Sequence, residues 1–326
     1  MINRRAFIST VALGILTMPL AAEGQQAGKV PRIGYLSAVS AETDKSRVAA
    51  FRQGLRELGY VEGETIVIEY RYEALPDARA LELGAELVRL KVDVLVAYGM
   101  SSVLKKLTGV IPVVFTVNAD PVGVGLAASL ARPGGNITGL SDLHSGTVTK
   151  RLEFLKEVAP SATQVAVLWN PASLIAPAQF KSLQAAAPAL GTTVLSLEVR
   201  GPADIERAFS VIGKERPGAL LVIGEPALVS NRRRIAELAI KNRLPAIGTT
   251  RQFADAGFLL AYGANFDDLW RRAAMYVDKI LKGAKPGDLP IEQASKWDLV
   301  INLKTAKALG LKIPQTLLLQ ANHVIE

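Results

Sequence analysis

The sequence predicts an α/β protein made of two doubly wound parallel-sheet lobes joined by a three-crossing hinge. Its 326 residues exceed one ordinary domain, and the hydrophobic content of 49% suffices for two cores. Continuous apolar, β-branched runs alternate with segments of helical periodicity, which is typical of parallel sheets covered on both faces. This alternation starts again after His144, so we expect two similar lobes.

The first half alternates strands with helices, and the buried run Ile111–Val117 is its most apolar member. The expected strands are Arg32–Ser37, Ile66–Tyr72, Val92–Ala97 and Ile111–Val117. The expected helices are Ser46–Leu58, Asp77–Leu90 with Asp77 as its cap, and a helix to Thr108 that Ser101 or Ser102 caps. Right-handed crossovers then give a parallel sheet.

The chain leaves this sheet through the residues that follow Val117. Asn118 to Gly123 is a polar turn, which we expect to open a short helix at Gly123–Ala131. Arg132–Asn136 stops that helix, and Ile137–Ser141 reads as a short extended segment that leads into the second lobe.

The second half repeats the pattern and ends in an additional strand and helix. Its expected strands are Gln164–Trp169, Thr193–Val199, Ala219–Ile223, Pro245–Gly248 and Gly257–Gly263, with short extended segments at Pro290–Gln293 and Asp298–Asn302. Its expected helices are Thr147–Val158, Ala178–Leu190, Pro202–Lys214, Ser230–Asn242, Asp267–Lys282 and Leu303–Leu309.

One strand and one helix are too little for a third domain, so the economical arrangement returns Phe258 to Lys282 to the first sheet. The predicted boundaries are 1–24 for a signal peptide, 30–140 plus 254–284 for lobe 1, and 141–253 plus 285–326 for lobe 2.

The N-terminus predicts export to the periplasm. Met1–Arg5 is positively charged, and Ala6–Leu20 is apolar but falls short of the ~20 residues that span a bilayer. Small residues at Ala22–Gly24 precede a cleavage site, so the mature chain is expected to begin near Gln25. The paired arginines fit both an ordinary secretory signal and a twin-arginine signal, and these alternatives stay open.

Charge and cysteine content restrict the partners. The net charge is +8, but the basic residues are scattered among acids in helical segments such as Arg47–Glu57, which indicates a solvated surface and no nucleic-acid partner. The absence of cysteine excludes disulfides, thiolate metal sites and a lipid anchor on a cysteine after the signal. We expect a monomer.

Reactive groups are scarce. His144 and His323 are the only histidines, and neither stands in a zinc-binding or triad pattern. The loop after the first strand lacks the glycine patterns that bind dinucleotides or nucleoside triphosphates. The sequence therefore predicts no metal, no cofactor and no catalytic residue, which favours a binding protein over an enzyme.

Small, polar and aromatic residues instead gather at predicted strand ends, where open α/β sheets bind ligands. The candidate ligand-binding residues are Ser37, Gly99, Ser101, Ser102, Asn118, Asp120, Trp169, Asn170, Glu225 and Tyr262. Ser101 and Ser102 at a helix start suit a carboxylate, Asp120 or Glu225 suits an ammonium group, and an aromatic ring suits a planar ligand body. Turn formation by Asp120 and Asn170, and core packing of Trp169, are the alternatives.

The chain resembles the bacterial ABC-transporter substrate-binding proteins of the type I periplasmic-binding-protein class, in the branch that includes tryptophan- and tyrosine-associated binding proteins. The resemblance covers essentially the whole mature chain and is carried by Phe51–Gly63, Ala85–Val94, Asp120–Gly123, Ser129–Ser141, Val167–Pro171, Tyr276–Pro286, Leu299–Leu311, Ile313–Pro314 and Val324–Glu326. Met100 departs from the smaller residues usual in its loop, which leaves the ligand's identity open.

This resemblance implies two lobes with three crossings, a ligand held between them, and delivery to an ABC permease that a separate ATPase subunit powers. The expected ligand is an amino acid or a related aromatic or carboxylated compound. Two rival functions stay open: a ligand-binding partner of a membrane sensory receptor, and a periplasmic lyase or hydrolase that uses Asp120 and Glu225.

Overall fold

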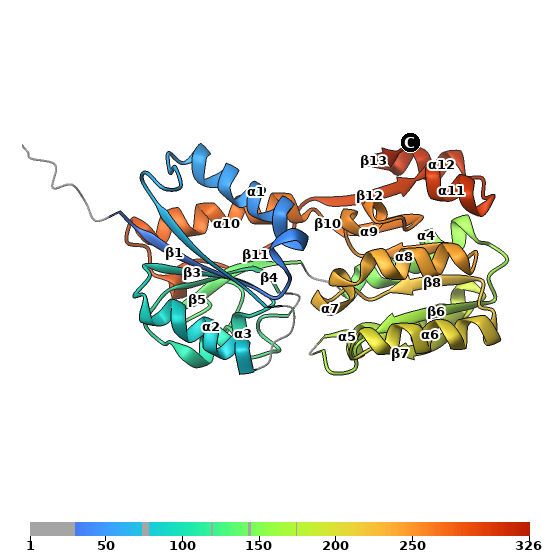
Figure 1. The fold of residues 1–326 in the computed structure, drawn as a ribbon, viewed down its shortest axis with the longest axis horizontal. Helices are drawn as coiled ribbons and strands as arrows, with labels where there is room; N and C mark the ends of the chain where they lie inside the picture. The colour runs from blue at the N-terminus through green and yellow to red at the C-terminus, as the bar shows by residue number, and fades with distance from the viewer. Residues whose placement is uncertain (1–29, 74–77, 119, 143–144, 174) are drawn as a thin grey trace, which may run out of the picture. The chain divides into compact units, whose positions relative to one another are not determined.

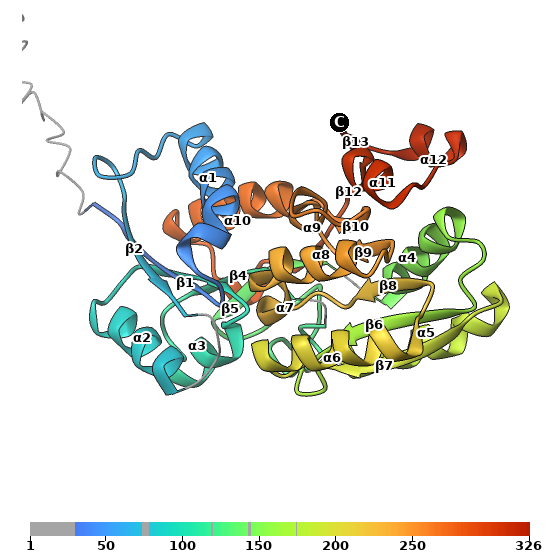
Figure 2. The ribbon, with the colours of Figure 1, turned by 45° about the vertical axis from the view of Figure 1, so that its right-hand side comes forward.

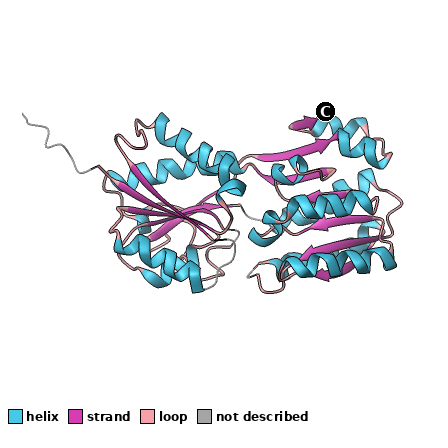
Figure 3. Ribbon diagram, viewed as in Figure 1, coloured by secondary structure: helices cyan, strands magenta, loops and turns pink. Residues whose placement is uncertain are grey.

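The computed structural model describes residues 30–73, 78–118, 120–142, 145–173 and 175–326 (Figure 1). The signal-peptide prediction, Asp77 and His144 lie outside these residues. Within the unit Pro31–Glu326, helices flank two separate sheets, as Figure 3 shows. The prediction of two parallel-sheet α/β lobes is confirmed.

The first sheet is parallel throughout, in the order β11-β5-β4-β3-β1-β2. Its strands are β1 (Arg32–Ser37), β2 (Val67–Tyr72), β3 (Val94–Tyr98), β4 (Val113–Val117), β5 (Ile137–Ser141) and β11 (Glu292–Gln293). Its helices are α1 (Ala41–Glu57), α2 (Ala78–Arg89), α3 (Ser101–Leu107), α10 (Phe266–Leu281) and the 3-10 turn η2 (Pro286–Asp288). Side chains of α1 and α10 form the core on one face, and those of α2 and α3 form the core on the other.

The second sheet has the order β13-β12-β10-β9-β8-β6-β7, and β12 runs antiparallel to β10. Its strands are β6 (Gln164–Trp169), β7 (Thr193–Glu198), β8 (Ala219–Val222), β9 (Ala246–Gly248), β10 (Leu260–Ala264), β12 (Trp297–Asn302) and β13 (His323–Ile325). Its helices are α4 (Ser145–Val158), α5 (Ala176–Ala186), η1 (Ala187–Leu190), α6 (Pro202–Glu215), α7 (Pro226–Ser230), α8 (Arg232–Lys241), α9 (Arg251–Asp255), α11 (Leu303–Leu309) and α12 (Gln315–Gln320). The cores on its two faces are built separately, from α4, α5, α11 and α12 and from α6 to α9.

The chain passes between the sheets three times: from β5 to α4, from β10 to α10, and from β11 to β12. This differs from the expected return of Phe258 to Lys282 to the first sheet, because strand β10 pairs with β9 and β12 of the second sheet. Within Phe258 to Lys282 only helix α10 returns to the first lobe, and it packs on α1. The prediction was right for helix α10, which packs in the first lobe. It was wrong for strand β10, whose apolar sequence is compatible with either sheet.

The predicted helix Gly123–Ala131 is wrong. Residues 121–131 form turns, in which the Pro121 carbonyl accepts the N–H groups of both Leu126 and Ala127. Gly125 has a φ of +70°, a conformation that interrupts a right-handed helix. None of the helices in the described ranges is long and apolar enough to cross a membrane.

Helices α1 and α10 lie side by side in both views of the ribbon (Figures 1 and 2). Helix α10 presents an apolar stripe at helical spacing that includes Trp270, Ala274 and Val277. Gly54 of α1 faces this stripe: an added Cβ would lie 2.5 Å from the Arg271 carbonyl oxygen and 2.9 Å from Ala274 Cβ. Gly54 therefore permits the close approach of the two backbones.

The substitution Gly54→Ala should lower the free energy of unfolding by about 1–3 kcal/mol, because the extra methyl group overpacks this contact. The matched control is Gly213→Ala in α6, where an added Cβ meets nothing within 4 Å. That change should leave stability unaltered or raise it by up to about 1 kcal/mol, since alanine is the better helix former. Urea unfolding of both variants measures the difference; equal effects would contradict the close packing of α1 on α10.

Candidate functional site

The ends of β1 and β3 lie together at one edge of the first sheet. The Ala38 N–H donates to the Tyr98 carbonyl at 2.9 Å. Ser37 is fully buried, and its Oγ has no hydrogen-bond partner among the described residues. Gly99 has a φ of +68°, and an added Cβ would lie 2.6 Å from Ala38 Cβ. Glycine is therefore required where these strand ends meet.

Helix α3 begins at Ser101, and its N-cap residue is Met100, which directly follows Gly99 and makes no side-chain cap hydrogen bond. The prediction that Ser101 or Ser102 caps this helix is wrong, because the fully buried Met100 side chain packs in the core and fixes the helix start one residue earlier. Ser101 is buried and Ser102 is half-buried. Both remain predicted ligand contacts.

The corresponding edge of the second sheet carries Asn170 after β6 and Glu225 after β8. Asn170 Nδ2 donates to both carboxylate oxygens of Glu225 at 3.1 Å. Burial raises the pKa of Glu225, and the Asn170 hydrogen bond opposes this rise. A partly buried carboxylate with one amide partner retains capacity for a cationic group.

The two sheet edges meet at Gly99. An added Cβ on this residue would lie 3.2 Å from Cγ of Pro226, the first residue of α7. The structure thus brings together Ser37, Gly99, Asn170 and Glu225, which stand far apart in the sequence. The carboxyl ends of strands from both lobes border the same region, and this is where α/β proteins bind ligands.

Two other predicted residues stabilise their own turn. Asn118 Oδ1 accepts the Asp120 N–H at 3.0 Å, and Asp120 Oδ1 accepts the Gly123 N–H at 2.7 Å. Asp120 is exposed. These bonds account for an Asx-type turn without a ligand, so Asp120 is a weaker candidate than Glu225 for an ammonium group.

The aromatic candidates pack into the second lobe. Trp169 is 9% exposed, stacks on Phe180 with 4.6 Å between ring centroids, and donates from Nε1 to Ser196 Oγ at 2.9 Å. The Tyr262 ring lies edge-on to Phe154 at 5.0 Å. Core packing explains both rings, and contact of either with a ligand stays a prediction.

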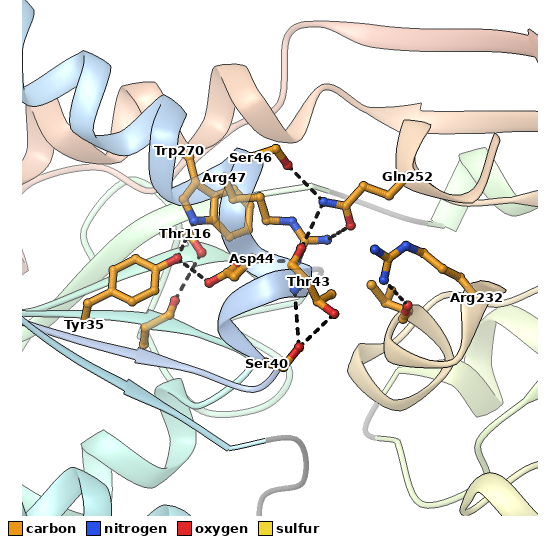
Figure 4. A network of polar contacts seen from close by, with 12 residues as sticks. Tyr35, Ser40, Thr43, Asp44, Ser46, Arg47, Thr116, Arg232, Gln252 and Trp270 are labelled. Atoms are coloured by element: carbon orange, nitrogen blue, oxygen red, sulfur yellow. Dashed lines mark hydrogen bonds and ion pairs between the residues drawn. The ribbon is translucent and has the colours of Figure 1, made fainter. Parts of the chain in front are cut away.

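The sequence analysis missed a buried polar network on α1, which Figure 4 shows. Arg47 and Asp44 are 1% and 0% exposed and form an ion pair with 3.4 Å between Nη1 and Oδ1. The second oxygen of Asp44 accepts from the Tyr35 hydroxyl at 2.8 Å, and that hydroxyl accepts from Trp270 Nε1 at 2.8 Å. This chain joins α1, β1 and α10.

Three aromatic rings surround the Arg47 guanidinium. Its Cζ lies 4.6 Å from the ring centroid of Tyr98, 5.2 Å from that of Phe266 and 5.3 Å from that of Trp270. Burial disfavours the charged form, but Tyr98 and Asp44 outweigh this and the pKa of Arg47 stays above its ordinary value. The guanidinium is therefore a buried, permanent positive charge.

Gln252 of α9 joins this network to the second lobe. Arg47 Nη2 donates to Gln252 Oε1 at 3.0 Å, and Gln252 Nε2 donates to Ser46 Oγ at 3.1 Å and to the Thr43 carbonyl at 3.4 Å. Thr43, Ser46 and Gln252, together with Arg232 and Arg233 of α8, line a groove of about 470 Å³, and Arg47 lies behind this lining through its bond to Gln252. None of the ten predicted ligand contacts lines it.

The prediction that the charges of Arg47–Glu57 belong to a solvated surface is therefore wrong for Arg47. Its position carried a signal: Asp44 and Arg47 extend the apolar stripe of Val48 and Phe51 by one helical turn. A charge pair at i,i+3 on the buried side of a helix indicates an internal ion pair.

A second buried guanidinium lies where the chain passes between the sheets. Arg151 of α4 donates from Nε to the Tyr262 carbonyl at 2.7 Å. Burial lowers the pKa of Arg151 to about 10, and the charge of Asp142 opposes this. Asp142 directly follows β5, and burial raises its pKa to about 7 while Arg151 opposes the rise. This pair lies beside two of the three connections.

No group of histidine, aspartate or glutamate side chains in the described ranges is arranged to hold a metal ion. Hydroxyl, amide, carboxylate and guanidinium groups dominate the region where the sheet edges meet. Such groups bind and orient a polar ligand.

Comparison with known proteins agrees with this architecture. A family model described as ABC transporter substrate binding protein matches residues 32–325. A tyrosine-binding protein from Clostridioides difficile is 27% identical over 272 residues, covering 82% of this chain and 77% of that protein. Two lobes, each built on one sheet, with strand ends that meet, are the architecture of a substrate-binding protein. Because the family model matches nearly the whole chain, the chain belongs to the ABC transporter substrate-binding protein family.

Two solved structures are similar over 91% of this chain and 100% of their own. A conserved domain protein from Vibrio cholerae has a TM-score of 0.84 and 28% identity. An ABC domain from Streptococcus pneumoniae in complex with L-Trp has a TM-score of 0.83 and 25% identity.

The raised pKa of Asp142 predicts a pH-dependent stability. The folded protein holds the Asp142 proton more tightly than the unfolded chain does, so this contribution is fully present below pH ~4 and is lost as the pH rises to about 7. As the pH rises from about 4 to about 7, the free energy of unfolding of the wild type should fall relative to that of Asp142→Asn, by as much as ~4 kcal/mol. Urea unfolding at pH 4 to 8 tests this, and a constant stability difference would contradict it.

Proposed function

We propose that this protein is the periplasmic solute-binding component of an ABC importer and captures an amino acid, or a related aromatic or carboxylated compound, between its two lobes. The observation that carries the proposal is the meeting of the two sheet edges at Gly99 and Pro226, which places strand ends of both lobes around one region. A relative named for tyrosine and a structural neighbour that contains L-Trp support this ligand class.

Tyr98 is the common neighbour of the polar groups in this region. Burial raises its pKa most, and the charges of Arg47, Asp142 and Glu225 also influence it. A ligand beside Tyr98 therefore lies within electrostatic range of charged groups from both lobes.

The ligand's ammonium group is assigned to Glu225, whose carboxylate is partly buried and has one side-chain hydrogen-bond partner, Asn170. The buried hydroxyls of Ser37 and Thr250 have no hydrogen-bond partner among the described residues, and they come from different lobes. Buried polar groups without partners are uncommon in folded proteins, so these two are natural ligand contacts.

Binding couples to transport through the hinge. A ligand that contacts both lobes stabilises the arrangement in which they close on it, and the permease then recognises this arrangement. The permease with its separate ATPase subunit, and the monomeric state of the binding protein, belong to this proposal.

Glu225→Gln should weaken the binding of L-tryptophan or L-tyrosine at least tenfold, because a charge-assisted hydrogen bond to ammonium contributes about 1.5–3 kcal/mol. The matched control is Asp120→Asn, which removes a carboxylate that serves its own turn. Calorimetry on protein refolded from denaturant, to remove copurified ligand, measures both. Unchanged affinity of Glu225→Gln would remove Glu225 from the site, and failure of the wild type to bind either amino acid would refute this ligand class.

Deletion of residues 1–24 should retain the protein in the cytoplasm, because the positively charged start and the apolar stretch that direct export are removed. Cell fractionation with immunodetection measures the location. Substitution of both Arg4 and Arg5 by lysine separates the two export routes, since the twin-arginine route requires the pair. Export of the truncated chain would contradict the signal assignment.

A further inference from the structure

Two guanidinium groups from different lobes point toward one another (Figure 4), and that of Arg47 lies over the Tyr98 ring, which borders the proposed ligand region. Arg47 belongs to α1 and Arg232 to α8. Thr43, Ser46 and Gln252 border the same groove as Arg232, and Gln252 also accepts from Arg47. Like charges in this arrangement repel one another, so the pair is favourable only when an anion or another compensating group offsets the repulsion.

The Arg47 guanidinium has an N–H donor available for a further hydrogen bond. Its side chain is 1% exposed, and Nε has no hydrogen-bond partner among the described residues. The nearest carboxylate, Asp44, lies at a long 3.4 Å and shares its other oxygen with Tyr35. A buried N–H of a charged group without an acceptor is costly, which favours a ligand acceptor at this position.

The positive charge of Arg232 is compensated less well than that of Arg47. In the part of the chain that the structure describes, its one side-chain hydrogen bond runs from Nη1 to the Val229 carbonyl at 2.8 Å, and it pairs with no carboxylate. Burial lowers the pKa of Arg232, and the positive charge of Arg47 lowers it further. The two cations therefore influence each other directly.

Glu42 and Asp255 line the same groove as Arg232, but among the described residues neither forms an ion pair with Arg47 or Arg232. Asp255 acts on Arg232 electrostatically, but its own ion pair is with Arg251 at 3.5 Å. Asp267 lies within electrostatic range of Arg47 and Arg251, and burial raises the pKa of its carboxyl group, which disfavours its charged form. Asp44 alone forms an ion pair with Arg47.

We propose that Arg47 and Arg232 together bind the carboxylate of the transported ligand, one from each lobe. This inference rests on the proposed function and deepens it, because it makes a negative charge the feature that the site selects. It assigns the carboxylate to guanidinium groups in place of Ser101 and Ser102. Guanidinium groups suit this role, since their planar N–H donors match the geometry of a carboxylate.

The arrangement also explains how Glu225 and the two arginines would bind the same ligand. Helix α7, which contains the Arg232 acceptor Val229, begins directly after Glu225. An amino acid can place its ammonium at Glu225 and its carboxylate at the arginines, with its body beside Tyr98. A neutral or cationic compound of the same shape would leave the arginine pair uncompensated and would be rejected.

The test uses acetate as the probe, because its effect depends on the anion site and not on the ligand's identity. Thermal unfolding of the refolded mature protein is followed in 50 mM sodium acetate and in 50 mM sodium chloride. Acetate should raise the wild-type midpoint by a few degrees more than chloride does. Arg232→Gln should abolish this difference, whereas the control Arg234→Gln, which changes an exposed arginine on the same helix outside the groove, should retain it.

Equal midpoints in acetate and chloride for the wild type, or equal losses in the two variants, would overturn the inference. Calorimetry with L-tryptophan and L-tyrosine then tests the arginine site separately from the proposed function. A wild type that binds either amino acid while Arg232→Gln binds it with unchanged affinity keeps the proposed function and refutes the arginine site. At least tenfold weaker binding by Arg232→Gln, with Arg234→Gln unchanged, supports both.

Discussion

The buried charge of Arg47 is the constraint on which this region of the structure depends. A guanidinium removed from water is stable only if its surroundings replace the lost solvation. Here Asp44 supplies the opposite charge, and three aromatic rings supply their negatively polarised faces. Because these groups come from α1, β3 and α10, solvating one side chain fixes the relative positions of three elements. Helix α10 must therefore return from the second lobe to complete the first.

That return shapes the hinge. Helix α10 is covalently continuous with β10 of the second sheet but packs on α1 of the first, so Asn265 between them belongs to neither core. Its Oδ1 caps α10 by accepting the Asp268 N–H at 2.8 Å, and its Nδ2 donates to Asp298 at 2.8 Å. A helix that begins at a chain crossing with its own cap can change direction there without losing hydrogen bonds.

Much of the fold was predictable, because long buried runs such as Ile111–Val117 leave little choice besides a covered parallel strand. The partner of a strand is less predictable: the apolar sequence of β10 fits either sheet, and only tertiary pairing decides. Ser37 and Glu225 were predicted as ligand contacts because the rule that places ligands at strand ends depends on topology alone, and their contact with a ligand stays a prediction. Arg47 was missed, since charged residues in helices are usually exposed. Whether an acidic residue serves a turn, as Asp120 does, is decided by local geometry that sequence does not display.

The two buried arginines have different electrostatic roles, and the contrast bears on how binding and closure are linked. Arg151 lies beside Asp142 and a backbone carbonyl of its own lobe, so its charge is compensated inside the protein near the connections. Among the described residues, the one carboxylate that forms an ion pair with Arg47 is Asp44, beside the three aromatic rings, and Arg232 adds a second positive charge from the other side. On the proposal that these arginines bind the ligand's carboxylate, repulsion between Arg47 and Arg232 would oppose the approach of the lobes until an anion intervenes. The interaction that recognises the ligand would then be the same one that permits closure, so an empty protein would not present the closed surface to its transporter.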